Sequence, residues 1–243
     1  SGGSRAVELG LITLKGTKSL ANVMFILGLL TAAGILYTSY VNTGSTFNAF
    51  YAAIIALIGV FVGYFYTAKP VRLSSRYGLG ELSIFLSFGP LLTLGTGFAI
   101  ANETIQLFSN EFYNLILLGI PIGLLTTNIL FINQYPDYAS DKKVGKNHLV
   151  VLLGKKSSRW IYALNLAIAV GSLYYISENI LNQTQGSLFL YLLIPVTMIY
   201  SYYLIAGLFK HYNSRSLIKY NIHTIYFHML FSFIYMVILA NFQ

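Results

Sequence analysis

Long apolar runs recur along the whole chain, and a short polar segment separates each run from the next. A helix of about 20 apolar residues can cross the hydrocarbon core of a bilayer. Lipid offers no partner to an unpaired backbone amide, and the runs lack the alternation of a membrane β-barrel, so we expect helices. The pattern predicts seven spans, near residues 19–41, 47–66, 81–101, 113–133, 160–177, 187–209 and 222–242.

Composition narrows the class of protein further. Hydrophobic residues make up 56% of the 243 positions and charged residues only 9%, against about 25% charged residues in soluble domains. These values exclude a water-soluble globule and a disordered chain. We therefore expect an all-α fold in which residues 1–243 form a single domain, a polytopic bundle of seven transmembrane helices surrounded by the lipid bilayer.

The basic residues are confined to alternate connections between the spans. All 15 Lys and Arg residues fall within 1–18, 67–80, 134–159 and 210–221, and the intervening connections contain none. Basic segments stay on the cytoplasmic side of a membrane. We expect an integral protein of the cell membrane with its basic loops in the cytoplasm and its C-terminus outside. This distribution explains the net charge of +8 without a nucleic-acid partner.

Oxygen-bearing side chains form a repeat at the cytoplasmic end of the fourth span. Asp137 and Asp141 are the only aspartates in the chain, and Asn133 precedes Asp137 by four residues. On a helix, these three side chains lie near one stripe. Mg²⁺ in proteins typically takes one or two carboxylates, waters and phosphate oxygens. The two carboxylates and the amide of Asn133 would therefore point the same way, and the spacing indicates a Mg²⁺–diphosphate site in which Asp137 and Asp141 are the candidate metal ligands.

Two features complicate this stripe. Pro136 removes a backbone donor and disfavours helix at Tyr135, so we expect a kink or a restart between Asn133 and Asp137. Lysines follow the stripe, and Lys142 and Lys146 are candidates for binding diphosphate oxygens. The alternatives are that the aspartates only solvate a loop or pair locally with Lys142, Lys143 and Lys146.

A second cluster of candidate residues lies in the loop between the second and third spans. Tyr66, Lys69, Arg72 and Arg76 fall within the segment 66–81. Arginine presents a planar fork that matches phosphate oxygens. We treat these four residues as candidate phosphate-binding groups. Contacts with lipid headgroups explain the basic residues nearly as well.

Two segments together resemble the UbiA superfamily of intramembrane prenyltransferases. Asn133–Gly154, N-Q-Y-P-D-Y-A-S-D-K-K-V-G-K-N-H-L-V-V-L-L-G, is similar to the second aspartate-rich motif of that superfamily. Tyr66–Glu81, Y-T-A-K-P-V-R-L-S-S-R-Y-G-L-G-E, resembles its Y-T-x-x-P…Y-x-G-L-G-E segment, particularly in the branch that prenylates dihydroxynaphthoate in menaquinone synthesis. His148 departs from the motif, which more often has Thr or Ser there.

The resemblance implies nine helices with a first aspartate motif on the second helix. This chain would then correspond to helices three to nine, and the first two helices and the first motif would precede Ser1. It also implies an enzyme that moves a polyprenyl group from polyprenyl diphosphate to an aromatic acceptor such as dihydroxynaphthoate, with Mg²⁺ as cofactor. Lys69, Arg72, Lys142 and Lys146 would assist the leaving diphosphate.

Other functions remain open from the sequence. The same superfamily offers other acceptors, namely a glycerophosphate lipid, a hydroxybenzoate or a porphyrin. A non-enzymatic transporter or lipid-binding subunit would also have several helices and basic loops. Transporters usually place ionisable residues near the midplane of the membrane. Here every charged residue lies at or beyond a span end, which favours a site at the membrane surface.

Overall fold

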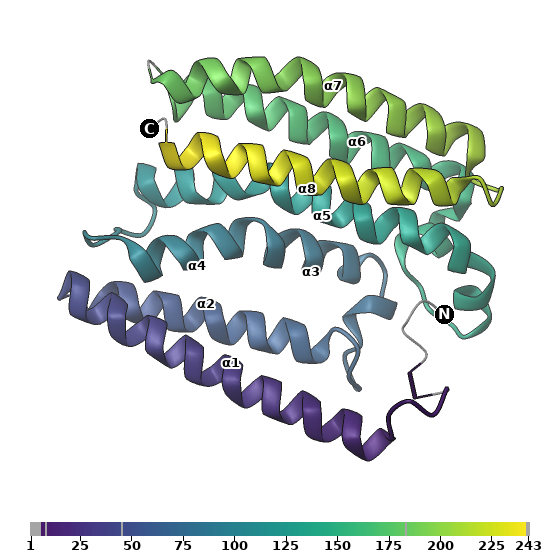
Figure 1. The fold of residues 1–243 in the computed structure, drawn as a ribbon, viewed down its shortest axis with the longest axis horizontal. Coiled ribbons are helices and arrows are strands. Elements are labelled where there is room, and N and C mark those ends of the chain that lie inside the picture. Colours follow the sequence, from purple (N-terminus) through teal and green to yellow (C-terminus); the bar gives the residue numbers. More distant parts are fainter. Residues whose placement is uncertain (1–5, 8, 45, 183, 242–243) are drawn as a thin grey trace.

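The computed structural model describes residues 6–7, 9–44, 46–182 and 184–241, and Figure 1 shows their arrangement. The α-helices are α1 (Leu14–Thr43), α2 (Thr46–Phe65), α3 (Leu79–Phe88), α4 (Pro90–Ile100), α5 (Asn110–Lys143), α6 (Leu149–Asn179), α7 (Gln185–His211) and α8 (Leu217–Asn241). A short 3₁₀ helix, η1, covers Leu73–Ser75. No β-strand occurs among the described residues. The predicted all-α class is confirmed.

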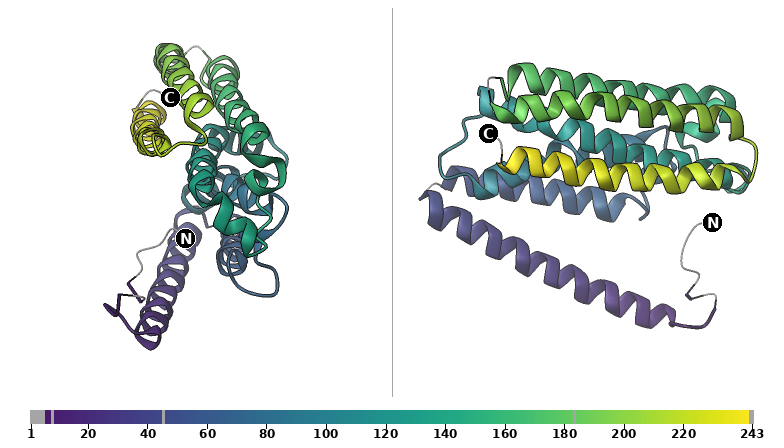
Figure 2. Two further views of the ribbon diagram at one scale, coloured as in Figure 1. Left: turned by 90° about the vertical axis from the view of Figure 1, so that its right-hand side faces the viewer. Right: turned by 45° about the horizontal axis from the view of Figure 1, so that its top comes forward.

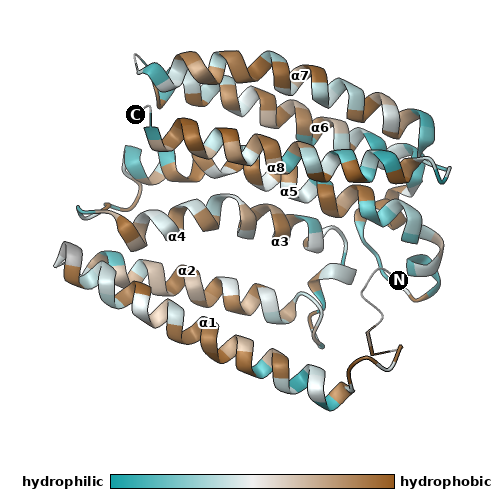
Figure 3. Cartoon of the chain, in the orientation of Figure 1, coloured by the Kyte–Doolittle hydropathy of each residue, from teal (hydrophilic) through white to brown (hydrophobic). Residues whose placement is uncertain are grey.

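Seven helical stretches are long and apolar enough to cross a membrane, with α3 and α4 together forming one of them. Figure 3 shows hydrophobic residues along the lengths of the helices and hydrophilic residues gathered at the two ends of the bundle. The prediction of a polytopic bundle with seven membrane-spanning segments is therefore confirmed.

Several helices extend beyond the spans expected from hydropathy. α5 runs through Pro136 to Lys143 as one helix, so the expected restart after Asn133 does not occur. A contact with α6 holds this turn: Tyr135 is fully buried, and its hydroxyl lies 2.8 Å from the Ser158 hydroxyl on α6. Tertiary contacts thus override the local preference of the proline.

Glycines mark the two interruptions inside the spans. Gly89 has φ −120° and ψ −108° and separates α3 from α4, which begins at Pro90. Gly154 has φ 76° and ψ 156°, a non-helical conformation near the start of α6. A positive φ of this kind is readily adopted by glycine. The residues 149–153 are therefore a short helical piece set off from the rest of α6.

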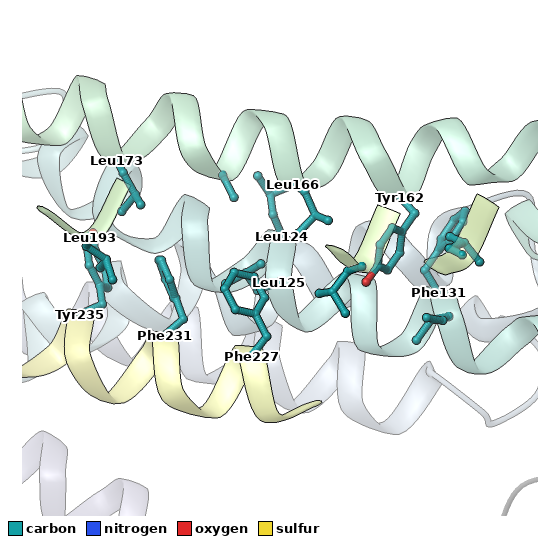
Figure 4. Close-up of a cluster of buried hydrophobic side chains, with 14 of the residues drawn as sticks. Leu124, Leu125, Phe131, Tyr162, Leu166, Leu173, Leu193, Phe227, Phe231 and Tyr235 are labelled. Carbon is teal, nitrogen blue, oxygen red and sulfur yellow. The ribbon is translucent and has the colours of Figure 1, made fainter. Parts of the chain in front are cut away.

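The main hydrophobic core lies among the last four helices. α5 contacts α6 and α8, and α7 also contacts α6 and α8, so the four helices form a closed bundle. Figure 4 shows Tyr162, Phe231 and Tyr235 among the side chains that fill the space between them. Hydrogen bonds also join α5 to α6. The Asn128 amide donates to the Tyr162 carbonyl at 3.1 Å, and the Asn165 amide donates to the Asn128 amide oxygen at 2.9 Å.

A smaller core joins α2 and α4 to the segment that precedes α5. Ala52, Leu94, Phe98 and Ile105 are buried in it. Asn48 ties α2 to that segment, because its amide donates to the Glu103 carbonyl at 2.8 Å and its oxygen accepts from the Ile105 amide at 3.1 Å. α1 packs mainly against α2 and α4 and diverges from the other helices toward its N-terminal end, as Figure 2 shows.

The backbones of α4 and α5 approach each other closely at glycine. A Cβ atom added to Gly119 would lie 2.6 Å from the carbonyl oxygen of Gly89, and one added to Gly123 would lie 3.0 Å from the Gly89 Cα. The Thr93 hydroxyl donates to the Leu115 carbonyl at 2.6 Å beside this contact. The interruption between α3 and α4 is therefore pressed against α5 with no room for a side chain.

Candidate active site

Two loops pair at one end of the bundle, on the right in Figure 1. The Asn147 amide donates to the Ser75 carbonyl at 3.0 Å, and Arg76 and Asn147 form an isolated parallel bridge. Gly78 has φ 81°, and a Cβ there would lie 2.8 Å from the Leu149 side chain. The loop after α2 and the loop after α5 thus cover the end of α5 together.

A cavity of about 290 Å³ lies beneath these loops. It is lined by Tyr66, Thr67, Ser74, Leu130, Asn133, Gln134, Asp137, Asp141, Lys146 and His148. The residues from α5 are spaced as one face of a helix requires. The structure therefore brings Asn133, Asp137 and Asp141 to one wall, together with Lys146 and Tyr66 from the loops.

Two hydrogen-bond donors hold the buried carboxylate of Asp141, the last residue of this wall on α5. The side chain of Asp141 is 8% exposed, and Lys146 Nζ lies 2.7 Å from its Oδ1. His148 Nε2 lies 3.2 Å from Oδ2. His148 Nδ1 accepts from the Val151 amide at 3.4 Å, so the ring proton belongs on Nε2 and is donated to Asp141. The alternative of local pairing therefore holds for Asp141, and its partner is Lys146.

The other two residues of the stripe, Asn133 and Asp137, have different surroundings. The Asn133 amide oxygen accepts from the Asn221 amide of α8 at 3.0 Å. Asp137 is half-buried, and no hydrogen bond or ion pair to its carboxylate occurs within the described residues. The carboxylate of Asp137 is therefore the acidic group on this wall that remains available to a ligand.

Glu81 is a site residue that the sequence did not single out. Its side chain is 4% exposed. Its Oε1 accepts from Gln134 Nε2 at 3.0 Å and from the Leu149 amide at 2.9 Å, so one carboxylate joins α3, α5 and the start of α6. Glu81 Oε2 and Gln134 Oε1 are buried, with no donor among the described residues. The sequence offered one signal, a lone acidic residue beside a strongly basic loop.

Removing the Glu81 carboxylate should destabilise this end of the bundle. Glu81→Ala leaves the Leu149 amide and the Gln134 amide buried without an acceptor, which should cost about 2 kcal/mol. The midpoint of thermal unfolding in detergent measures the loss. Glu81→Gln is the matched control, because its amide oxygen can still accept both bonds and should recover most of the stability. Equal losses in the two variants would show that the charge of Glu81 matters and its acceptor role does not.

Tyr66 is the member of the first loop that reaches the cavity. Burial and the nearby Glu81 carboxylate raise its pKa to about 12. The phenol therefore keeps its proton at neutral pH and can donate a hydrogen bond to an anion.

The remaining candidate phosphate-binding residues lie outside the cavity lining. Lys69, Arg72 and Arg76 are exposed, and Arg76 donates to the Pro70 carbonyl at 2.8 Å. Lys142 Nζ lies 5.9 Å from the centre of the Tyr138 ring. The structure does not bring these four residues to the wall of Asp137, and their role in binding stays a prediction.

The donor set fits a hard cation that arrives with its own oxygen ligands. Within the described part of the chain, no three His, Cys, Asp or Glu side chains come together as a metal-binding group. The wall supplies the carboxylates of Asp137 and Asp141. Mg²⁺ commonly completes such a set with waters and substrate phosphates. These residues fit a metal–diphosphate pair better than a cation held by protein ligands alone.

The fold and this cavity define a class: a helical membrane protein with a carboxylate-bearing polar cavity at one end of its spans. The chain belongs to the UbiA prenyltransferase family, whose profile matches residues 4–236. No solved structure matches the chain significantly.

Several curated relatives are similar over part of their length. A 1,4-dihydroxy-2-naphthoate octaprenyltransferase of Bacillus subtilis is 31% identical over 122 residues, which cover 50% of this chain and 37% of that protein. The enzyme with the same name from Haemophilus influenzae is 28% identical over 165 residues, covering 68% and 50%. A 2-carboxy-1,4-naphthoquinone phytyltransferase of Synechocystis is 34% identical over 126 residues, covering 51% and 37%. The chain thus spans between about a third and a half of these relatives.

Proposed function

We propose that the protein transfers a polyprenyl group from polyprenyl diphosphate to an aromatic acceptor of the dihydroxynaphthoate type. The observation that carries this proposal is the shared wall of Asp137, Asp141 and Asn133, which faces a cavity at the end of an apolar bundle. Membership in the UbiA prenyltransferase family supports the reaction class. The naphthoate prenyltransferases among its relatives support the class of acceptor.

The polar wall is suited to hold a diphosphate. Asp137 and Asp141 would bind Mg²⁺, and Asn133 would add or orient an oxygen ligand. Bound Mg²⁺ would supply positive charge against the negative charge that develops on the diphosphate as the allylic C–O bond ionises. Lys146 already holds Asp141 at 2.7 Å and borders the cavity, so its ammonium group can also attract a phosphate oxygen.

The apolar helices would serve the other half of the substrate. An isoprenoid tail has no polar groups, and the helices beyond the cavity are predominantly hydrophobic (Figure 3). Burial of the allylic carbon among such side chains excludes water, which would otherwise capture the carbocation. The arrangement separates a charged leaving group at the membrane surface from a reactive carbon in a dry environment.

The orientation in the membrane follows the distribution of charge. The described Lys and Arg residues lie at the start of α1, in the loops after α2, α5 and α7, and on the helix turns that flank these loops. We infer that this end faces the cytoplasm, because basic loops are retained there. The cavity would then take a prenyl diphosphate from the cytoplasmic side, and the C-terminus would lie outside.

A direct assay tests this function. Protein expressed from its complete gene is mixed with a polyprenyl diphosphate, 1,4-dihydroxy-2-naphthoate and Mg²⁺, and released diphosphate and prenylated product are measured. We expect product that disappears when EDTA removes the divalent cation. Hydroxybenzoate, a glycerophosphate lipid and a porphyrin serve as competing acceptors. Faster transfer to one of them would overturn the acceptor, and no transfer to any would overturn the enzymatic function.

Tyr66 should contribute to binding of the diphosphate. Tyr66→Phe removes one phenolic donor and leaves the ring in place, so KM for the prenyl diphosphate should rise about tenfold, the typical effect of losing a hydrogen bond to a charged group. Steady-state kinetics at saturating acceptor measure it. Tyr64→Phe is the matched control, because Tyr64 is exposed on α2. A normal KM in Tyr66→Phe would exclude this contact.

A further inference from the structure

A second cavity lies on the opposite side of α5 from the aspartates. Its volume is about 240 Å³, and it lies between α5, α6 and the loop that joins α7 to α8. Its lining consists of Tyr135, Pro136, Lys155, Tyr212, Asn213, Ser214, Arg215, Leu217 and Ile218. The two cavities share no lining residue. Successive residues of a helix are turned by about 100°, so Tyr135 faces away from Asn133 and Asp137.

The charge around this second cavity is positive, and Lys155 lies over the Tyr138 ring with Nζ 5.6 Å from the ring centre. Lys155 and Arg215 line it, and the lining contains no Asp or Glu. Across the described residues, neither cation forms an ion pair with a carboxylate. Arg159 adds a third positive charge at the border, with its guanidinium 4.4 Å from the centre of the Tyr212 ring. A cavity with this lining attracts an anion.

Polar and apolar groups are divided within the lining. Asn213 and Ser214 offer neutral polar groups beside the cations, whereas Pro136, Leu217 and Ile218 are apolar. The volume lies below the roughly 300–1,000 Å³ typical of sites for drug-sized ligands. The cavity therefore fits a small anionic group attached to an apolar body.

The surroundings place this cavity at the membrane surface. Trp160 is 66% exposed on α6, and its ring packs edge-on against Phe209 with centroids 4.9 Å apart. Exposed tryptophan at the end of a span is typical of the boundary between lipid and water. Arg159 packs on Phe209 as well, at 4.4 Å. The cations thus lie at the depth of the lipid headgroups.

We propose that this cavity binds the phosphate group of an anionic membrane phospholipid. Arg215 presents a planar fork to two phosphate oxygens and Lys155 supplies a second charge. Leu217 and Ile218 lie against the first carbons of the acyl chains. Basic pockets between transmembrane helices bind anionic headgroups in this manner. The apolar half of the lining favours a lipid over free phosphate. The proposal is independent of the prenyl-transfer function.

Thermal unfolding in the presence of lipid tests the proposal. The purified chain in a neutral detergent is titrated with short-chain phosphatidylglycerol, with the matching phosphatidylcholine, and with inorganic phosphate. Phosphatidylglycerol should raise the unfolding midpoint, and the other two should leave it unchanged at equal concentrations. Lys155→Gln combined with Arg215→Gln should weaken the apparent affinity for phosphatidylglycerol about 30-fold, from about 1 kcal/mol for each basic residue near the surface.

A matched control removes the same charge elsewhere. Lys156 and Lys219 are exposed neighbours that do not line the cavity, so Lys156→Gln combined with Lys219→Gln should keep the affinity. Equal losses in the two double variants would overturn the site in favour of general surface charge. An equal shift with inorganic phosphate would overturn the lipid, and an equal shift with phosphatidylcholine would overturn the requirement for an anion.

A measurement on the unmodified protein removes any dependence on folding of the variants. The chain is extracted from vesicles that contain equal amounts of phosphatidylglycerol and phosphatidylcholine, and retained lipid is identified by native mass spectrometry. Preferential retention of phosphatidylglycerol supports the site. Retention of the two lipids in equal amounts refutes it.

Discussion

Replacing Asp137 with asparagine is expected to lower the rate of diphosphate release at least 100-fold. The Asp137 carboxylate lines the cavity without an ion-pair or hydrogen-bond partner in the described part of the protein, so its charge is available to a metal–diphosphate ligand. Loss of one preorganised electrostatic contact to a developing charge typically costs about 100- to 1,000-fold in rate. Single-turnover measurements at saturating Mg²⁺ would separate this loss in the chemical step from weaker binding.

A carboxylate at the other end of the bundle provides the control. Glu178 lies near the C-terminal end of α6, away from the cavity, and Glu178→Gln should keep normal turnover. Asp141→Asn should also slow the reaction, since Asp141 shares the wall. Normal turnover in both aspartate variants would refute the metal–diphosphate site. Loss in Glu178→Gln of the size seen for Asp137→Asn would point to a general effect of charge on the fold.

Gly119→Ala is expected to destabilise the bundle strongly, because the added methyl group would meet backbone atoms. The added Cβ would lie 2.6 Å from the Gly89 carbonyl oxygen and 2.5 Å from its carbonyl carbon. Backbone atoms cannot rotate away as a side chain can, so α4 and α5 must separate. Forced overpacking of this kind costs about 3 kcal/mol. The midpoint of thermal unfolding in detergent should fall by several degrees.

Gly171 offers a matched substitution in an open position. It lies inside α6, and a Cβ added there meets no atom within 4 Å. Alanine is the better helix former by about 1 kcal/mol, so Gly171→Ala should leave the midpoint unchanged or raise it. A similar fall in both variants would show that glycine flexibility, rather than contact between α4 and α5, sets the effect.

The bundle could be predicted from the sequence because hydropathy alone decides which segments enter a membrane. Each expected span overlaps one of the seven long apolar helical stretches, and the third span covers α3 and α4 together. The ends of the helices were predicted less accurately. α5 continues to Lys143, beyond the expected end near residue 133, and α6 begins at Leu149, before the expected start near residue 160. These extensions contain charged residues and leave the apolar layer, so their helical conformation depends on tertiary contacts that hydropathy does not report.

Pro136 shows how such contacts decide local structure. A proline in mid-helix removes one hydrogen bond and favours a kink. At this turn, Tyr135 packs toward Ser158 while Gln134 donates to Glu81. Bonds to α3 and to α6 hold the turn in helical register, and the stripe from Asn133 to Asp141 stays on one wall.

Only the part of the candidate site that lies on a single helix, α5, could be predicted from the sequence. The spacing of Asn133, Asp137 and Asp141 defines one face of α5 without other information. The contact between Glu81 and Leu149 joins residues 68 positions apart. Its prediction requires the pairing of two loops, which no periodicity reveals. For the same reason, the exposure of Lys69 and Arg72 beside the half-buried Tyr66 follows from the path of the loop and not from composition.

The non-helical conformation of Gly154 divides α6 into a short piece next to the site and a long membrane-spanning piece. The bonds from Asp141 to His148 and from Glu81 to Leu149 both lie before this glycine, whereas the packing of α6 against α7 lies beyond it. Val150 lies in the short piece before this glycine and is fully buried in the main core. The short piece therefore ties the polar loop of the site to the membrane-spanning helices.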